Sequence, residues 1–279
     1  MENEWFPGVR YFVSAIKRIF LSTKYLIHVV LTLLLSFFSL RILEMVNQVS
    51  EVMPSEMMDA FRTGGMYNIG ILSVSRLNVI DGPFYDEMLL GVLSGSFMQC
   101  ILAVLVSTFI CSEYKNGYVG LAIMHGQKRM SIFNQYILVS SILIIPLIIT
   151  SVVGTLISLS VHNMVSFSNA NQIIGILLIQ TFMLIAVGIS ITSFSIMVGN
   201  NKAIGVSVGG IFILPLIPSY IRVFTNGKVN IDRFLLLNQL IISGNSDEIN
   251  ITQYVLVALT TSMFFYIVGL MVFKYRNFE

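Results

Sequence analysis

The sequence predicts an all-α membrane protein with six transmembrane helices, and two observations carry this prediction. Of its 279 residues, 56% are hydrophobic and 11% are charged, and the mean hydropathy is +0.85, a composition outside the range of soluble domains. Six apolar segments each approach the ~20 residues that a helix needs to cross the hydrocarbon core, where only a helix satisfies its own backbone in a chain of this type. The predicted spans are Tyr25–Leu43, Met88–Cys111, Tyr136–Ser160, Gln172–Val198, Ala203–Phe224 and Gln253–Phe273.

The N-terminal segment, residues 1–24, is predicted to form an amphipathic helix on the cytoplasmic membrane surface. Apolar residues recur at helical spacing between Val9 and Phe20, and polar and basic residues gather on the opposite side. We expect the cations to lie among anionic headgroups and the apolar face to lie at the acyl boundary. A plain basic flank of the first span is the alternative. The remaining residues, 25–279, are predicted to form one six-span domain.

The distribution of lysine and arginine predicts the orientation of the chain. With a cytoplasmic N-terminus, ten of the 16 cations lie inside, in agreement with the positive-inside rule, and both termini are cytoplasmic. The net charge of +2 is too small to indicate a nucleic-acid partner. The ten inside cations are Arg10, Lys17, Arg18, Lys24, Lys115, Lys128, Arg129, Lys202, Lys274 and Arg276.

Three connecting segments are long enough to carry structure. The outer loop 44–87 is expected to form a small cap or short surface helices, because it is too short for a large receptor domain. The segment 112–135 is cytoplasmic. The outer loop 225–252 contains the apolar piece 234–242, which is too short to span and therefore predicts a re-entrant or interfacial helix between spans five and six.

The spans contain almost no titrating side chain. Arg41 and Arg222 lie at outer span ends, where they can reach water, and His28 lies near the cytoplasmic end of the first span. Ion-coupled carriers usually hold ionisable groups at bilayer depth, so this pattern argues against one. The chain also lacks the H-E-x-x-H, G-x-S-x-G and G-x-x-x-x-G-K-[ST] motifs, and Cys100 and Cys111 do not indicate a disulfide framework. We therefore expect no catalytic, cofactor or metal site in this chain.

Small residues and prolines mark two spans. Gly91 and Gly95 in the second span, and Gly205 and Gly209 in the fifth, form small-xxx-small patterns that let helices approach closely, either within the chain or between subunits. Pro215 and Pro218 lie in the outer half of the fifth span and disturb its hydrogen bonding. This pair is a candidate gate, and a static bend is the equal alternative.

The segment between spans two and three is predicted to be an elbow that another protein grips. It combines an acid, several cations and a glycine near each end, where the chain must turn. The candidate coupling residues are Glu113, Lys115, Gly117, Tyr118, Gly126, Lys128 and Arg129. With the N-terminal helix, the apolar piece 234–242 and the basic tail at 273–276, this layout resembles the permease subunits of ABC type-2 exporters. Asn134-Gln135 departs from that family, whose members often carry a lysine after the basic cluster.

The resemblance implies partners and a function. An ATPase subunit that binds ATP and Mg²⁺ would push on the elbow and the N-terminal helix, and a second permease subunit, identical or related, would complete the complex. Similar bacterial permeases reside in the cell membrane and export amphipathic peptides such as antimicrobial peptides, lantibiotics and toxins, or lipids. Two other classes stay open: a non-transporting immunity or sensor component that binds peptides, and an ion-driven carrier.

Overall fold

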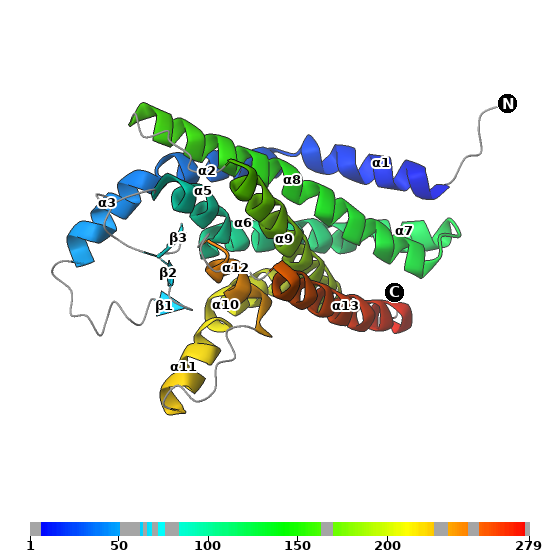
Figure 1. Ribbon diagram of the computed structural model, residues 1–279. Helices are drawn as coiled ribbons and strands as arrows, with labels where there is room; N and C mark the ends of the chain where they lie inside the picture. The colour runs from blue at the N-terminus through cyan, green and yellow to red at the C-terminus, as the bar shows by residue number, and fades with distance from the viewer. Residues whose placement is uncertain are drawn as a thin grey trace.

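The computed structural model describes a helical protein with a small sheet at one end (Figure 1). The described residues are 7–50, 62–63, 66–68, 72–75, 84–162, 170–225, 234–244 and 251–276. The helices are α1 Pro7–Phe20, α2 Thr23–Phe37, α3 Ser39–Ser50, α5 Phe84–Ser94, α6 Ser96–Lys115, α7 Tyr118–Met124, α8 Arg129–Val161, α9 Ala170–Val198, α10 Lys202–Ile213, α11 Leu216–Phe224, α12 Leu236–Ile242 and α13 Ile251–Tyr275.

Within the described residues, four helices are long and apolar enough to cross a membrane. They are Asp86–Lys115, Arg129–Val161, Asn171–Val198 and Ile251–Tyr275, and they correspond to the second, third, fourth and sixth predicted spans. The first of them is formed by α5 and α6, which meet at a break at Gly95. The central helix α9 packs against α13, α6 and α8.

The first predicted span differs from a single straight helix. The helix α2 ends at Phe37, and its 15 residues extend about 22 Å, which is less than the hydrocarbon thickness. It meets α1 at a bend of 56°, and the two together pass as a fifth candidate span. Beyond it, α3 continues to Ser50, so the region predicted as an outer loop from residue 44 begins as helix.

The fifth predicted span, Ala203–Phe224, is wrong as one continuous helix. It forms two helices, α10 and α11, that are separated at Leu214 and Pro215, and each is too short to span alone. The proline lacks the N–H that would bond the carbonyl of Ile211 and crowds that carbonyl, so the helix ends where the sequence predicted a kink. The helix α11 points away from the remaining helices (Figure 1).

The predicted outer loop 44–87 contains three short strands that an all-helical prediction missed. They are β1 Arg62–Thr63, β2 Met66–Asn68 and β3 Ser73–Val74, in an antiparallel sheet of order β1-β2-β3. The sheet packs closely against α5. A Cβ atom at Gly91 of α5 would overlap the carbonyl oxygen of Ser73 in β3. We call this part of the molecule the sheet end.

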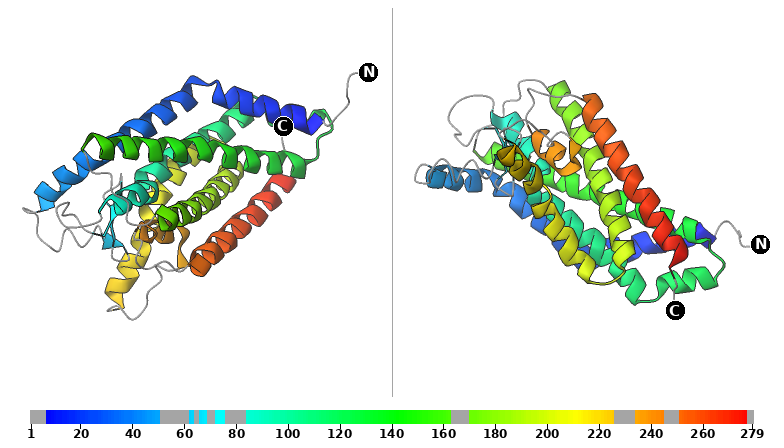
Figure 2. Two further views of the ribbon diagram at one scale, coloured as in Figure 1. Left: turned by 45° about the horizontal axis from the view of Figure 1, so that its top comes forward. Right: turned by 90° about the horizontal axis from the view of Figure 1, so that it is seen from below.

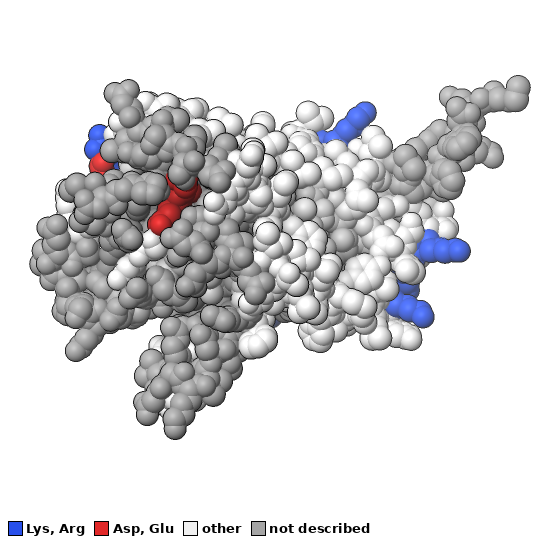
Figure 3. Space-filling model, viewed as in Figure 1, with Lys and Arg blue, Asp and Glu red and all other residues white. Residues whose placement is uncertain are grey.

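The opposite end of the molecule carries α7, the start of α1 and the end of α13, and we call it the elbow end (Figures 1 and 2). Most Lys and Arg side chains on the face shown in Figure 3 lie at or near this end, whereas the acidic ones lie toward the sheet end. The predicted short helix after span five is present as α12, and it is buried against α9, α13 and α5 instead of lying on a surface.

Glycines allow several pairs of helices to approach closely inside the bundle. A Cβ atom at Gly154 of α8 would lie 2.9 Å from the carbonyl oxygen of Leu33 in α2, and one at Gly269 of α13 would lie 2.7 Å from the Cβ of Ser193 in α9. The outer faces are apolar, as on α13, where Met263 is 66% exposed and Phe264 is 62% exposed. A small-residue interior and an apolar exterior are typical of a multi-pass membrane protein.

Candidate functional site

The elbow between α6 and α8 is built around two turns, each made by glycine. The helix α6 ends at Lys115, and Gly117 adopts a φ of 71° immediately before α7. Gly126 adopts a φ of 80° after α7, before α8 begins at Arg129. Both values lie in the left-handed region that glycine occupies without a steric penalty. The two predicted turn glycines therefore let α7 lie between two long helices.

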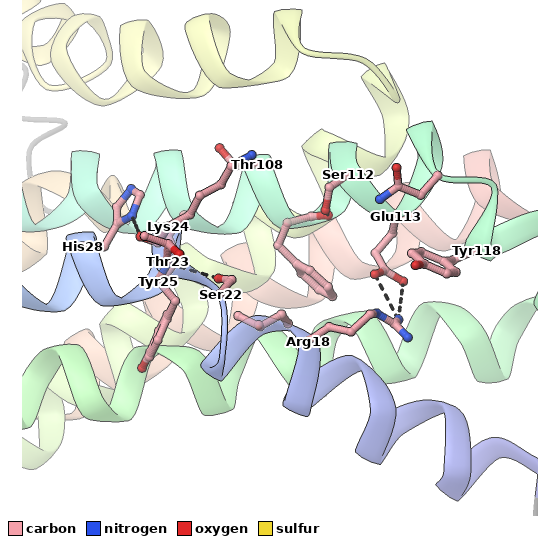
Figure 4. Close-up of a pocket in the computed structure, with 14 residues that line it drawn as sticks. Arg18, Ser22, Thr23, Lys24, Tyr25, His28, Thr108, Ser112, Glu113 and Tyr118 are labelled. Carbon is pink, nitrogen blue, oxygen red and sulfur yellow. Dashed lines mark hydrogen bonds and ion pairs between the residues drawn. The ribbon is translucent and has the colours of Figure 1, made fainter.

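The acid of the predicted coupling set, Glu113, lies inside the protein, with 3% of its surface exposed. Arg18 Nη2 of α1 donates to both carboxylate oxygens at 3.1 Å (Figure 4). The Tyr11 hydroxyl donates to Oε2 at 2.8 Å. The Tyr11 hydroxyl also lies 2.9 Å from the Tyr136 hydroxyl of α8. The sequence placed Arg18 among lipid headgroups, but the structure turns it inward to pair with Glu113.

This group of side chains joins four helices, and we call it the junction: Tyr11, Arg18, Glu113, Tyr118 and Tyr136. The Arg18 guanidinium lies 4.3 Å from the ring centroid of Tyr118 in α7, within the range of a cation–π contact. Burial and the charge of Glu113 raise the pKa of Tyr11, so its hydroxyl stays protonated and donates to the carboxylate. The junction therefore fixes the N-terminal helix to the elbow by charged hydrogen bonds.

Two other cations of the elbow end hold helix ends. Arg129 Nη1 donates to the carbonyl oxygens of Lys274 at 2.7 Å and Arg276 at 2.8 Å, at the end of α13. Arg276 Nη1 donates to the carbonyl oxygen of Ile196 at 2.6 Å, in the last turn of α9. Its guanidinium fills the space beside Gly199, where a Cβ atom would overlap it. A cation at a helix C-terminus stabilises the unpaired carbonyls and the helix dipole.

The exposed surface of the elbow combines apolar and basic side chains. Leu121 is 44% exposed and Met124 is 75% exposed, and both belong to α7. Lys115 and Lys128 are exposed at the two sides of this helix. A hollow of about 700 Å³ adjoins α7, and the loop at Asn200 lines its other side. Of the predicted coupling set, Lys115 and Lys128 therefore lie on the surface, whereas Glu113, Tyr118 and Arg129 make contacts within the chain.

The predicted packing and gate residues fall in different surroundings. Gly91 contacts β3, and Gly95 is the residue before α6, with an extended ψ of 145°. A Cβ atom at Gly205 or Gly209 would have no atom of the described residues within 4 Å, so this face of α10 is open in the part of the chain that the structure describes. The gate candidates are Pro215, directly before α11, and Pro218, in the first turn of α11, and both are buried.

Sequence reasoning missed the partners of the junction. The pairing of Arg18 with Glu113 spans 95 residues, and no local pattern signals a contact of that separation. The capping role of Arg276 had one local signal, the basic tail that follows the last apolar segment. Among the described residues, no group of three or more His, Cys, Asp or Glu side chains could hold a metal ion, and both cysteines are free thiols.

Comparisons of the chain with models of protein families, with curated proteins and with solved structures find no match. The geometry of the elbow end is therefore the basis for a functional interpretation.

Proposed function

We propose that this chain is the membrane-spanning subunit of an ATP-driven exporter of the ABC type-2 class. In this proposal the elbow end faces the cytoplasm of a bacterial cell and both termini are cytoplasmic. A partner ATPase binds ATP and Mg²⁺ and contacts α7, and a second permease subunit completes the membrane part. The cargo is an amphipathic peptide or a lipid.

The observation that carries the proposal is the exposed apolar surface of α7 at the basic end of the molecule. Leu121 and Met124 are exposed on a short helix outside the candidate spans, between the exposed cations Lys115 and Lys128. An apolar patch that is rimmed by charged side chains in water is typical of a protein-binding surface. The hollow of about 700 Å³ beside α7 offers space for side chains of such a partner.

The connections of α7 support a role in transmitting force. Tyr118 of α7 touches the Arg18 guanidinium, which is bonded to Glu113 of α6. A push on α7 would therefore reach α1 and α6 through the junction, and Tyr136 extends the path to α8. Charged hydrogen bonds in a buried setting resist separation more than surface pairs do.

The open face of α10 supports a second membrane subunit. Beside Gly205 and Gly209, Val206 is 54% exposed and Phe212 is 46% exposed. Small residues on an apolar helix allow close backbone contact with another helix, which is a main source of association energy in lipid. We therefore place a copy of this chain, or a related permease, against α10.

An ion-driven carrier is the second candidate, and two buried carboxamides favour it. Gln99 in α6 and Gln180 in α9 are both 0% exposed, and their side-chain oxygens accept no hydrogen bond from any described residue. The amide nitrogen of Gln99 donates to the carbonyl oxygen of Ser94, and that of Gln180 donates to the carbonyl oxygen of Leu90. These hydrogen bonds hold the two side-chain amide groups in place. Unpaired buried oxygens are potential ligands of a monovalent cation. Uptake that collapses with an ionophore and persists without ATP would select this candidate.

The decisive experiment for the exporter compares two exposed methionines. We expect Met124→Glu in α7 to lower the amount of an ABC ATPase that co-purifies from native membranes, by about tenfold for a loss of ~1.4 kcal/mol. Met45→Glu in α3 is the matched control, since Met45 is 65% exposed and lies toward the sheet end. Equal recovery of the ATPase with both variants, or no ABC ATPase with the wild type, would refute the proposal.

A further inference from the structure

A second hollow lies where α1 meets α2, and Arg18, Glu113 and Tyr118 of the junction form one side of it. Its volume is about 390 Å³, and its walls come from the bend between the two helices and from α6. Figure 4 shows Ser22, Lys24 and His28 on the α2 side, with Thr108 and Ser112 on the α6 side. Polar side chains therefore line part of the hollow, and apolar side chains such as Leu105 and Phe109 line the rest.

The charge of this hollow is positive. Its one carboxylate, Glu113, already accepts hydrogen bonds from Arg18 and Tyr11, so it does not neutralise another cation. Lys24 is exposed, and within the described part of the chain no carboxylate forms an ion pair with it. The site thus has a cation available to an anionic ligand.

Further donors of the hollow point to an anion with several oxygen atoms. His28 Nδ1 lies 2.6 Å from the carbonyl oxygen of Lys24 and donates to it, so this N–H is not available to a ligand. The hydroxyl groups of Thr23 on one wall and Thr108 on the other add donors. The backbone N–H groups of Thr23 and Lys24, in the first turn of α2, have no acceptor within the helix.

The surface that continues from this hollow is apolar and runs along α2. Ile27 is 58% exposed, Leu31 is 43% exposed and Leu34 is 46% exposed. These positions follow Lys24 at intervals of three, four and three residues, so they lie on one stripe of the helix. A ligand with a phosphate at Lys24 would therefore find an acyl-chain surface directly beside it, which a free phosphate would not use.

We propose that the hollow at the α1–α2 bend binds the phosphate of an anionic phospholipid. Lys24 attracts the phosphate, the hydroxyl groups of the two walls bond its oxygens, and the acyl chains lie along the stripe of α2. Basic pockets between membrane helices at a headgroup surface bind anionic lipids by the same chemistry. The lipid would rest against the same α1 helix that the junction joins to α6. This inference is independent of ATP-driven export, and it holds for any function of the chain.

The test is the lipid retained by purified protein in phosphatidylcholine nanodiscs that contain a small fraction of phosphatidylglycerol, measured by native mass spectrometry. We expect Lys24→Gln to reduce bound phosphatidylglycerol about fivefold, the effect of losing one cation near an anionic surface. Lys17→Gln is the matched control, because Lys17 is exposed on α1 and does not line the hollow. The melting temperature in pure phosphatidylcholine should be the same for both variants.

Two results would overturn this assignment. If Lys24→Gln and Lys17→Gln lose equal amounts of phosphatidylglycerol, the lipid is attracted by the overall charge of the surface and not held at the hollow. If millimolar inorganic phosphate displaces the lipid from wild-type protein, the site takes a free phosphate and the stripe on α2 has no part in binding.

Discussion

The elbow end and the α10–α11 arm, residues 202–224, differ in how their side chains are packed. At the elbow end, Glu113, Arg129 and Arg276 satisfy partners from other helices within the chain. On the arm, a Cβ atom at Gly205 or Gly209 would meet no described atom within 4 Å, and α11 points away from the other helices (Figures 1 and 2). One region is tied together by its own charges, and the other presents an apolar surface that no described residue covers at these glycines.

This difference separates two kinds of task. A region crossed by charged hydrogen bonds moves as a unit, so it suits the transmission of force from a partner in water. An open small-residue face in lipid gains most of its packing energy only when another helix covers it. The comparison therefore predicts that substitutions at the elbow end reduce the stability of the chain, whereas substitutions on the arm reduce its association.

The largest expected effect is that of Glu113→Ala in the junction. Removing the carboxylate leaves the Arg18 guanidinium and the Tyr11 hydroxyl without their acceptor, at a cost of about 2–3 kcal/mol because Arg18 is 33% exposed. Glu44→Ala is the control, since its pair with Arg41 lies on the surface and contributes less than about 1 kcal/mol. Thermal unfolding in detergent measures both, and equal shifts would show that the junction does not stabilise the elbow.

The second largest effect is expected from one of a matched pair of glycine substitutions. Gly154→Leu would force α8 away from Leu33 and Ser36 of α2 and should destabilise the chain by about 1–3 kcal/mol. A Cβ atom at Gly205 meets no atom of the described residues within 4 Å, so Gly205→Leu should leave the unfolding temperature unchanged. Single-molecule counting of subunits in nanodiscs should instead show fewer dimers for Gly205→Leu. Wild-type protein that is monomeric under all conditions would contradict the assigned role of the arm.

The smallest expected effect is that of Arg276→Ala at the end of α9. The substitution removes the donor to the Ile196 carbonyl and should cost about 1 kcal/mol. Hydrogen exchange of the last turn of α9 should increase at the same time, because that turn loses its cap. Lys274→Ala is the control, since the Lys274 ammonium lies 5.6 Å from the ring centroid of its neighbour Tyr275 and not at the end of α9. Exchange that increases equally in both variants would show that Arg276 does not cap α9.

The sequence was sufficient for the long helices and insufficient for the contacts between them. The helices α8, α9 and α13 lie where apolar runs predicted them, because a long run of apolar residues has one stable form in lipid. Pro215 marked the position of the break in the fifth span, yet the apolar run around it suggested a full span. The strands of the sheet end, two or three residues each, are too short to produce a periodic pattern.

The sequence predicted which segment forms the candidate site, but it did not predict how the side chains of the site are arranged. The glycines at 117 and 126 were identifiable because turns restrict the residues that they accept. The inward orientation of Arg18 could not be identified from the sequence. Its helical spacing fits a lipid-facing cation equally well, and its partner Glu113 lies 95 residues away. The packing glycine Gly269 lacks a small-xxx-small signature, because Phe265 and Phe273 stand four residues to either side of it, so no pattern in the sequence indicated its contact with Ser193.

The most direct test of the central claim is photo-crosslinking from Leu121 in intact membranes. A photoreactive residue at Leu121, which is 44% exposed on α7, should form a covalent adduct with an ABC ATPase, and the yield should change when ATP is depleted. The same probe at Met45, toward the sheet end, should give no such adduct. Adducts of Leu121 with lipid alone would contradict the claim that another protein drives this elbow.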